Sequence, residues 1–304
     1  MSFRVTQASL SNTTLSNIQQ NYKKMQEIQE KLSSGKNINR ASDDPVSTRK
    51  LLGFKSEENE LQQYLDAIKH AKDKIDFIFD ALENIQEIMV KIQTKAVQAA
   101  DGTLGDDERG IIASELDEFM ETIIQFSNVT DSDGRYLFSG TKTTTAPFSA
   151  TRDSSGEITA VSYNGNNETI QYQIGSNTFI QVNQPGGKLF MENSIFDTLL
   201  KLRDELKSSN FDTNTFLSYK KDFETANTNV LTGITKFGSK VDRLELTENR
   251  IENSKTALKE LISYTEDADI AELITDLKNQ ENVLQAALQT GARVIQPTLL
   301  DFIG

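Results

Sequence analysis

The sequence contains no cysteine, no tryptophan and one histidine, and these shortages exclude several kinds of chemistry. Without cysteine, the chain can form no disulfide, no thiolate zinc site and no cysteine nucleophile. The single His70 stands beside Lys69 on the polar side of a heptad pattern, so we expect a solvated side chain that holds no metal and serves no catalytic triad. We predict no enzyme activity and no cofactor, although a hydrolase that uses carboxylates alone stays an open alternative.

Proline is also scarce, with 4 residues in 304, and no apolar run reaches the roughly 18 residues that a membrane span requires. These features favour long helices and predict no insertion into a membrane. The net charge of −13 argues against nucleic acid as a partner, because phosphates repel an acidic surface. The first 20 residues lack the apolar core of a secretory signal, so we expect a cytoplasmic protein or export without a cleaved signal peptide.

A heptad pattern is the strongest feature that is present. Apolar residues recur at alternating spacings of three and four between residues 61 and 99, which places them on one stripe of a single helix. Additional apolar residues at Leu65, Phe79 and Ile88 widen the stripe, which favours several helical neighbours over one coiled-coil partner. The stripe consists of Leu61, Tyr64, Ile68, Ala71, Ile75, Ile78, Leu82, Ile85, Met89, Ile92, Ala96 and Ala99.

Further helices follow from similar patterns. A short link at Gly102 joins the first helix to a second over residues 112–126, which predicts an antiparallel hairpin. Helices are also expected over residues 195–206 and 214–264, and the longer one has an apolar residue at every seventh position from Val230. We expect this longer helix to form one wall of a bundle.

The segment SDDP at residues 42–45 predicts the start of a helix. Ser42 is expected to be the N-cap, with acidic residues and Pro45 in the first turn. Neighbouring carboxylates at a helix start face different ways, so a catalytic acid pair is not expected here.

Residues 141–190 differ in composition from the helices. Thr, Ser, Asn and Gly dominate, and the stretch TIQYQIG at 169–175 alternates apolar and polar residues, as strands do. Asn-Gly at 164–165 and Gly-Ser at 175–176 are typical of turns. We predict a small β-rich domain inserted between helices.

The segment DSDGRYLFSG, residues 131–140, leads into this insert. DSDG matches part of a calcium loop, but no Glu follows at the twelfth position, so a turn with positive φ at the glycine is the better interpretation. The aromatic residues that follow are expected to anchor the chain in apolar contact. The predicted exit turn comprises Gly134, Arg135, Tyr136 and Phe138.

The two ends of the chain carry complementary patterns. Residues 1–40 have a net charge of +4 and residues 265–304 a net charge of −5, which suits two amphipathic helices that pair. Such a pair has little core to offset ordering costs of roughly 1–2 kcal/mol per residue, so we expect ends that are loose in the monomer and fold on assembly. The predicted seam includes Tyr22, Gln29, Ile270, Gln280 and Ala287, and its assembly residues are Leu15, Ile18, Met25, Leu32, Leu273, Leu277, Leu284 and Val294.

These segments together predict a mainly α protein. Its terminal parts are expected to form a long antiparallel helical bundle or coiled coil, with the small β-rich domain inserted. The predicted domains are a terminal coiled coil of residues 1–42 and 265–304, a helical rod of 43–138 and 195–264, and an outer domain of 139–194.

Four segments resemble known proteins. KLSSGKNINRASDDP, residues 31–45, resembles the amino-terminal signature of the flagellin family, and residues 267–304 resemble its carboxy-terminal helix. GTLGDDER at 102–109 and the GRYLFSG run within 128–148 are similar to the hook-associated junction proteins of that family. Asp133 departs from the usual Asn of that run, and Asp tolerates the turn nearly as well.

The resemblance implies a structural, non-enzymatic protein of the bacterial flagellum that joins hook to filament for motility. It implies secretion to the cell exterior through the flagellar type III pathway and assembly into a ring of about eleven subunits. The implied partners are other copies of the chain, the proximal hook-associated junction protein, flagellin and an export chaperone for hook-associated proteins. The chaperone is expected to cover the apolar end that contains Leu299, Leu300, Phe302 and Ile303.

Two other interpretations stay open. The first is flagellin itself, the filament subunit, which the GRYLFSG segment disfavours. The second is a non-flagellar coiled-coil protein with a structural or signalling role, which would have folded ends in the monomer and would not be exported.

Overall fold

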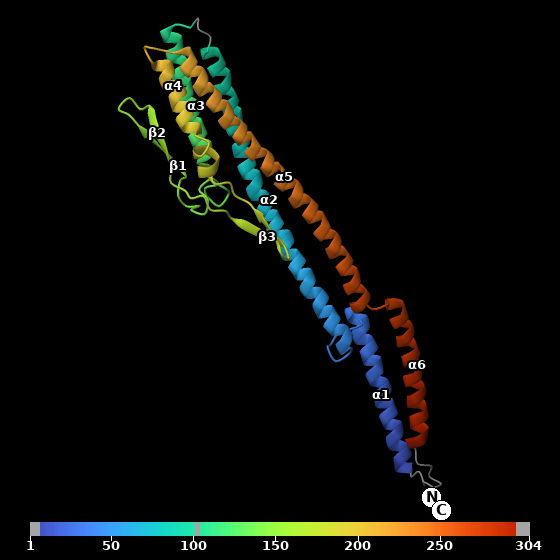
Figure 1. The fold of residues 1–304 in the computed structure, drawn as a ribbon. Helices are drawn as coiled ribbons and strands as arrows, with labels where there is room; N and C mark the ends of the chain where they lie inside the picture. The colour runs from blue at the N-terminus through green and yellow to red at the C-terminus, as the bar shows by residue number, and fades with distance from the viewer. Residues whose placement is uncertain (1–6, 101–103, 296–304) are drawn as a thin grey trace, which may run out of the picture. The chain divides into compact units, whose positions relative to one another are not determined.

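The computed structural model describes residues 7–100 and 104–295, and their side chains except those of residues 7–8 and 294–295. The predicted mainly α fold with an antiparallel-strand insertion is confirmed (Figure 1). The elements in chain order are α1 (Gln7–Ser34), α2 (Pro45–Ala99), α3 (Asp106–Ser127), β1 (Phe148–Arg152), β2 (Ile158–Tyr163), β3 (Gln171–Gly175), β4 (Thr178–Gln181), the π-helix η1 (Gly187–Met191), α4 (Ile195–Lys207), α5 (Thr213–Glu266) and α6 (Ile270–Ile295).

The chain packs into two compact units. One unit comprises residues 1–60 and 254–304, and the other comprises residues 61–253. The long helices α2 and α5 therefore each contribute to both units. The strands belong to the second unit together with α3 and α4, and the three-part domain division given above stays a prediction.

The core of the second unit is built on the predicted stripe of α2. Every stripe residue from Ile68 to Ala99 is fully buried, whereas Leu61 and Tyr64 at its start are partly buried. Phe237 and Leu244 of α5 are buried in the same core, as the seven-residue spacing of that helix predicts. Burying one such side chain stabilises the fold by about 1.5–3 kcal/mol, so this stripe contributes a large share of the unit's stability.

Polar contacts fix the direction of the helices in this unit. Lys72 Nζ of α2 lies 2.5 Å from Glu248 of α5, and Gln93 Nε2, further along α2, donates to Glu224, which lies earlier in α5. These two helices are therefore antiparallel. Lys95 of α2 pairs with Glu115 of α3 at 2.6 Å, which confirms that α2 and α3 lie side by side as a helical hairpin.

The insertion consists of two antiparallel hairpins, β1–β2 and β3–β4, in separate two-stranded sheets. The Gly-Ser turn signal at 175–176 is confirmed between β3 and β4. The Asn-Gly pair at 164–165 instead connects β2 to β3, which belong to different sheets, so it closes no hairpin. The β1–β2 turn is formed at Asp153, whose Oδ1 accepts from the backbone N–H of Ser155 (2.9 Å), and at Gly156, where φ is +93°.

Helix α2 starts with a different cap from the one predicted. Asp44 Oδ1 accepts hydrogen bonds from the backbone N–H groups of Val46 and Ser47, both at 3.0 Å, and Pro45 is the first helical residue. The predicted N-cap Ser42 is therefore wrong, because a cap must directly precede the first residue of the helix. Hydrogen bonds from Ser47 lower the pKa of Asp44 below its ordinary value, which keeps this cap ionised.

Candidate functional site

Helices α1 and α6 pack side by side in the unit of residues 1–60 and 254–304 (Figure 1). Gln280 Nε2 of α6 donates to the backbone oxygen of Asn21 at 3.1 Å, while Gly291, further along α6, lies against Ile18 and Thr14, which are earlier in α1. The pair is therefore antiparallel. A Cβ on Gly291 would lie 3.1 Å from Ile18 Cδ1, so a larger residue there would require the Ile18 side chain to shift.

The buried seam of α1 differs from the predicted one. Leu15 and Tyr22 are each 50% exposed and Gln29 is exposed, so these residues do not lie in the seam with α6, and the assembly role of Leu15 stays a prediction. The predicted positions of Ile18, Met25 and Leu32 are retained. The half-buried residues of α1 are Ser11, Thr14, Ile18, Asn21, Met25, Ile28, Lys31 and Leu32.

The physical reason for the shift is that two heptad stripes share the same three apolar residues. Residues spaced by seven leave two choices for the position between them, one on either side of the helix face. In the structure, the buried stripe of α1 is the one that contains Asn21 and Ile28. Asn21 accepts a hydrogen bond from Gln280, and Ile28 is half-buried whereas the polar Gln29 is exposed. The partner helix therefore decides which stripe is buried.

The predicted seam residues of α6 lie along its packed side except Ile270, which is 42% exposed. Leu273 is buried, and Leu277, Gln280 and Leu284 are half-buried. Val294 belongs to α6, but its side chain lies outside the described residues. The predicted chaperone-binding residues Leu299, Leu300, Phe302 and Ile303 also lie outside the described residues.

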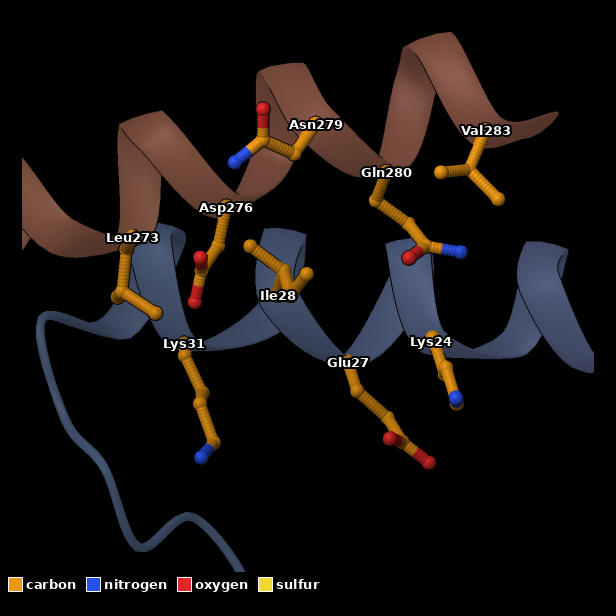
Figure 2. Close-up of a pocket in the computed structure, with 9 residues that line it drawn as sticks. All are labelled: Lys24, Glu27, Ile28, Lys31, Leu273, Asp276, Asn279, Gln280 and Val283. Carbon is orange, nitrogen blue, oxygen red and sulfur yellow. The ribbon is translucent and has the colours of Figure 1, made fainter. Parts of the chain in front are cut away.

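A groove of about 410 Å³ runs between α1 and α6 (Figure 2). Figure 2 shows Leu273, Asp276 and Gln280 pointing from α6 toward α1, while Lys24 and Lys31 of α1 point away from α6. The floor is partly apolar and the rim carries charges of both signs, which suits contact with another amphipathic helix. The lining residues are Lys24, Glu27, Ile28, Lys31, Leu273, Asp276, Asn279, Gln280 and Val283.

Apolar side chains also remain on the outer faces of this helix pair. Leu10, Leu15 and Tyr22 of α1 are about half exposed. Ile270, Ile274 and Leu288 of α6 are exposed to a similar extent. Two helices cannot cover apolar residues on several faces at once, so these faces are suited to further helical neighbours.

Glu266, at the end of α5, joins three segments of this unit. Its carboxylate lies 2.7 Å from Lys36 Nζ and 2.9 Å from Lys55 Nζ, and its own side chain is only 9% exposed. Its backbone oxygen accepts from Asn37 N (2.7 Å), and Gly35, with φ +70°, accepts from Ala268 N (3.0 Å). No local pattern in the sequence marks Glu266 as a functional residue, because its partners are more than 200 positions away.

The two lysines determine the ionisation of Glu266. Burial raises its pKa, but hydrogen bonds and charges from Lys36 and Lys55 outweigh burial, so the pKa of Glu266 lies below its ordinary value. The hydrogen bond to Glu266 raises the pKa of Lys36 above its ordinary value. Both groups are therefore charged over the whole neutral range.

The variant Glu266→Gln is expected to lower the free energy of unfolding by about 1–2 kcal/mol at neutral pH, because charge-assisted hydrogen bonds to half-exposed lysines are lost. Because the pKa of Glu266 is lowered in the folded chain, its carboxylate stabilises the folded state at pH values above the ordinary pKa of 4.5. This stabilisation is lost as the pH falls through the lower pKa of the folded state. The difference between wild type and variant should therefore shrink toward zero in acid. Urea unfolding at a series of pH values measures it.

The matched control is Glu260→Gln, which removes an exposed carboxylate from the same helix. This control should change the unfolding free energy little at any pH. A difference between Glu266→Gln and wild type that persists unchanged in strong acid would contradict the role of the Glu266 charge.

The exit turn combines a polar bend with a buried aromatic residue. Gly134 has φ +75°, as predicted, and Asp131 Oδ1 accepts from Arg135 N at 2.9 Å. Arg135 is exposed and Tyr136 half-buried, whereas Phe138 is fully buried against Phe190, with ring centroids 5.6 Å apart. The role of this turn as a domain exit stays a prediction.

The described part of the chain holds no group of three or more His, Cys, Asp or Glu residues suited to a metal ion. His70 is exposed. Among helices in the described ranges, none contains a stretch long and apolar enough to cross a membrane.

Comparison with known protein families identifies two regions of the chain that are related to flagellin. Residues 5–143 match the bacterial flagellin N-terminal helical region, and residues 221–303 match the bacterial flagellin C-terminal helical region. The two matches contain α1 to α3 and α6 completely and leave most of the strand insertion between them.

The individual proteins that the chain resembles are also flagellar proteins. The chain is 30% identical over 161 residues to flagellar hook-associated protein 3 of Escherichia coli, a match that covers 53% of this chain and 48% of the relative. It is 30% identical over 136 residues to a flagellin of Clostridium tyrobutyricum, covering 44% of this chain and 35% of the relative. The chain thus spans about half the length, or less, of these curated relatives.

A solved structure shows the same fold. The FlgL crystal structure from Xanthomonas campestris superposes with a TM-score of 0.60 at 17% identity, covering 68% of this chain and 98% of that chain. At this identity the likeness concerns the fold alone.

Proposed function

Because this chain belongs to the flagellin family, we propose that it is a structural subunit of the bacterial flagellum that joins the hook to the filament. The observation that carries the proposal is the match to flagellar hook-associated protein 3. The proposed role is assembly and not catalysis. Its location would be the flagellum, outside the cell.

Assembly is proposed to proceed through the terminal helices. The apolar faces of α1 and α6 that the pair leaves exposed would be covered by neighbouring subunits, in a ring of about eleven copies. The proposed assembly residues remain Leu15, Ile18, Met25, Leu32, Leu273, Leu277, Leu284 and Val294. Of these, Leu15 is exposed in the single chain and so is available to a neighbour.

The proposal includes export and partners. A chain without disulfides, with ends loose before assembly, is suited to pass unfolded through the flagellar type III pathway. The proposed partners are the proximal hook-associated junction protein on one side, flagellin on the other, and an export chaperone before secretion. Leu299, Leu300, Phe302 and Ile303 are the proposed chaperone contacts.

Flagellin itself is the second candidate, supported by the match to the flagellin of Clostridium tyrobutyricum. Deletion of the gene separates the two candidates. A junction protein predicts hooks without filaments and flagellin released into the medium, whereas a filament subunit predicts bare hooks and no flagellin in the medium. Electron microscopy and an immunoassay of the medium measure both results, and normal filaments would contradict both candidates.

The exposed apolar face of α1 provides a sharper test of assembly. The double variant Leu15→Glu, Tyr22→Glu is expected to leave the subunit folded, because both side chains are half exposed, and to reduce the number of filaments by about tenfold or more. Filaments are counted by electron microscopy after the deletion strain is complemented with each variant. Asn17→Glu on the exposed side of the same helix is the control, and an equal loss with this control would contradict a specific interface.

A further inference from the structure

A second groove, of about 500 Å³, lies within the unit of residues 61–253, between the strand insertion and α5. Its volume falls in the range of sites that bind small ligands. Its lining contains three lysines, several amide and hydroxyl side chains, and no carboxylate. That composition is unusual in a chain whose net charge is −13.

The three lysines come from two elements. Lys236 and Lys240 lie one turn apart on α5, a spacing at which like charges repel, and Lys188 lies on η1. None of the three forms an ion pair with any residue that the structure describes. Their charges therefore converge on the groove without a protein counter-ion.

Lys240 is the most enclosed of these cations. It is half-buried, and its ammonium lies 4.3 Å from the centre of the Phe237 ring. Burial lowers the pKa of Lys240 below its ordinary value, and no neighbouring carboxylate offsets this effect. An anion in the groove would remove the penalty of holding that charge away from water.

The amide groups around the lysines are held in place. Asn229 Nδ2 donates to Asn193 Oδ1 at 2.9 Å, and Asn193 Nδ2 donates to the backbone oxygen of Leu189 at 2.7 Å. Gln181 Nε2 donates to the backbone oxygen of Asn183 at 2.8 Å. These contacts fix the orientation of polar groups before any ligand arrives, which lowers the entropy lost on binding.

The chemistry of the lining distinguishes between kinds of anion. Phosphate sites favour guanidinium forks and free backbone N–H groups, and the groove has no arginine in its lining. Amide and hydroxyl side chains both donate and accept hydrogen bonds, as sugar hydroxyls require, and lysines pair with carboxylates. We propose that this groove binds an acidic saccharide, with the ammonium groups of Lys188, Lys236 and Lys240 on its carboxylates and the amides of Asn193 and Asn229 on its hydroxyls.

The proposal goes beyond a junction role and does not depend on it, because binding is measured on the isolated full chain. Calorimetric titration with trigalacturonate, a carboxylated trisaccharide, is expected to show saturable binding that weakens as salt rises. Neutral maltotriose should bind at least about tenfold more weakly, because it leaves the ammonium groups without a counter-ion.

Variants locate the site. Lys188→Gln, Lys236→Gln and Lys240→Gln together are expected to weaken trigalacturonate binding at least about tenfold. The matched control changes three exposed lysines outside the groove, Lys69→Gln, Lys142→Gln and Lys221→Gln, and should bind as wild type does. Circular dichroism before titration confirms that each variant is folded.

Several results would overturn the proposal. No binding by the folded wild-type chain would remove the site, and equal weakening by the groove and control variants would reduce it to non-specific electrostatics. Tighter binding of tripolyphosphate than of trigalacturonate would assign the groove to phosphates. Equal binding of maltotriose and trigalacturonate would show that the lysines do not recognise charge.

Discussion

The variant Phe148→Ala is expected to lower the free energy of unfolding of the second unit by about 3–5 kcal/mol. The Phe148 ring is buried among other aromatic rings, with centroids 5.2 Å from Tyr163, 5.5 Å from Phe190 and 5.6 Å from Phe196. Alanine would leave a cavity that rings fixed by one another cannot close. The large expected loss follows from lost burial together with an unfilled cavity.

The position of Phe148 adds to the effect. Its backbone N–H donates to Asn128 Oδ1 and its carbonyl oxygen accepts from Asn128 Nδ2, both at 2.9 Å, so this residue joins the first strand to the end of α3. Gly186 also packs on the ring, since a Cβ there would lie 2.6 Å from Phe148 Cζ. Loss of the ring should therefore loosen the β1–β2 hairpin and the segment at Gly186 from the helices.

Urea unfolding followed by circular dichroism measures this loss, and hydrogen exchange locates it. The control is Phe179→Ala, which removes a phenyl ring that is 53% exposed on β4 and should change stability by less than about 0.5 kcal/mol. If the two variants were equally stable, the aromatic cluster would not be the anchor of the insertion.

The variant Arg203→Ala is expected to lower the free energy of unfolding by about 3 kcal/mol, because it leaves the buried carbonyl of Ile158 and the half-buried carboxylate of Asp117 unpaired. Arg203 is 4% exposed, and its Nη1 lies 2.6 Å from Asp117 Oδ1 of α3 and 2.5 Å from the backbone oxygen of Ile158 in β2. Burial lowers the pKa of Arg203, but Asp204 and Asp117 outweigh it and hold the pKa above its ordinary value. This permanently charged side chain thus joins α4, α3 and the first hairpin.

A second variant separates the charge from its packing. The double variant Arg203→Met, Asp117→Leu removes both charges and keeps apolar volume, so it is expected to be more stable than Arg203→Ala. Arg243→Ala, at an exposed arginine of α5, is the matched control and should be nearly neutral. Equal destabilisation by Arg203→Ala and by the double variant would contradict the role of the unpaired carboxylate and of lost volume, and would assign the loss to the hydrogen bond to the Ile158 carbonyl that both variants lack.

The local sequence determined much of this protein. The stripe of α2 is buried from Ile68 to Ala99 as its spacing predicts, because a period near 3.5 residues fixes one face of a helix whatever lies opposite. Composition likewise located the strand insertion, and Gly134 takes the positive φ that a glycine in such a turn allows. The family resemblance rests on equally local segments.

The tertiary structure decided the rest. Residues Leu15 and Tyr22 satisfy a heptad pattern as well as Thr14 and Asn21 do, and only contact with α6 selects the second pair for the seam. Glu266 bonds lysines more than 200 positions away, and Arg203 bonds a strand carbonyl that has no side-chain signal. The periodicity of a sequence describes one helix or strand at a time. Which face of a helix is buried, and which residues form an ion pair, depend on the distant element that packs against that helix.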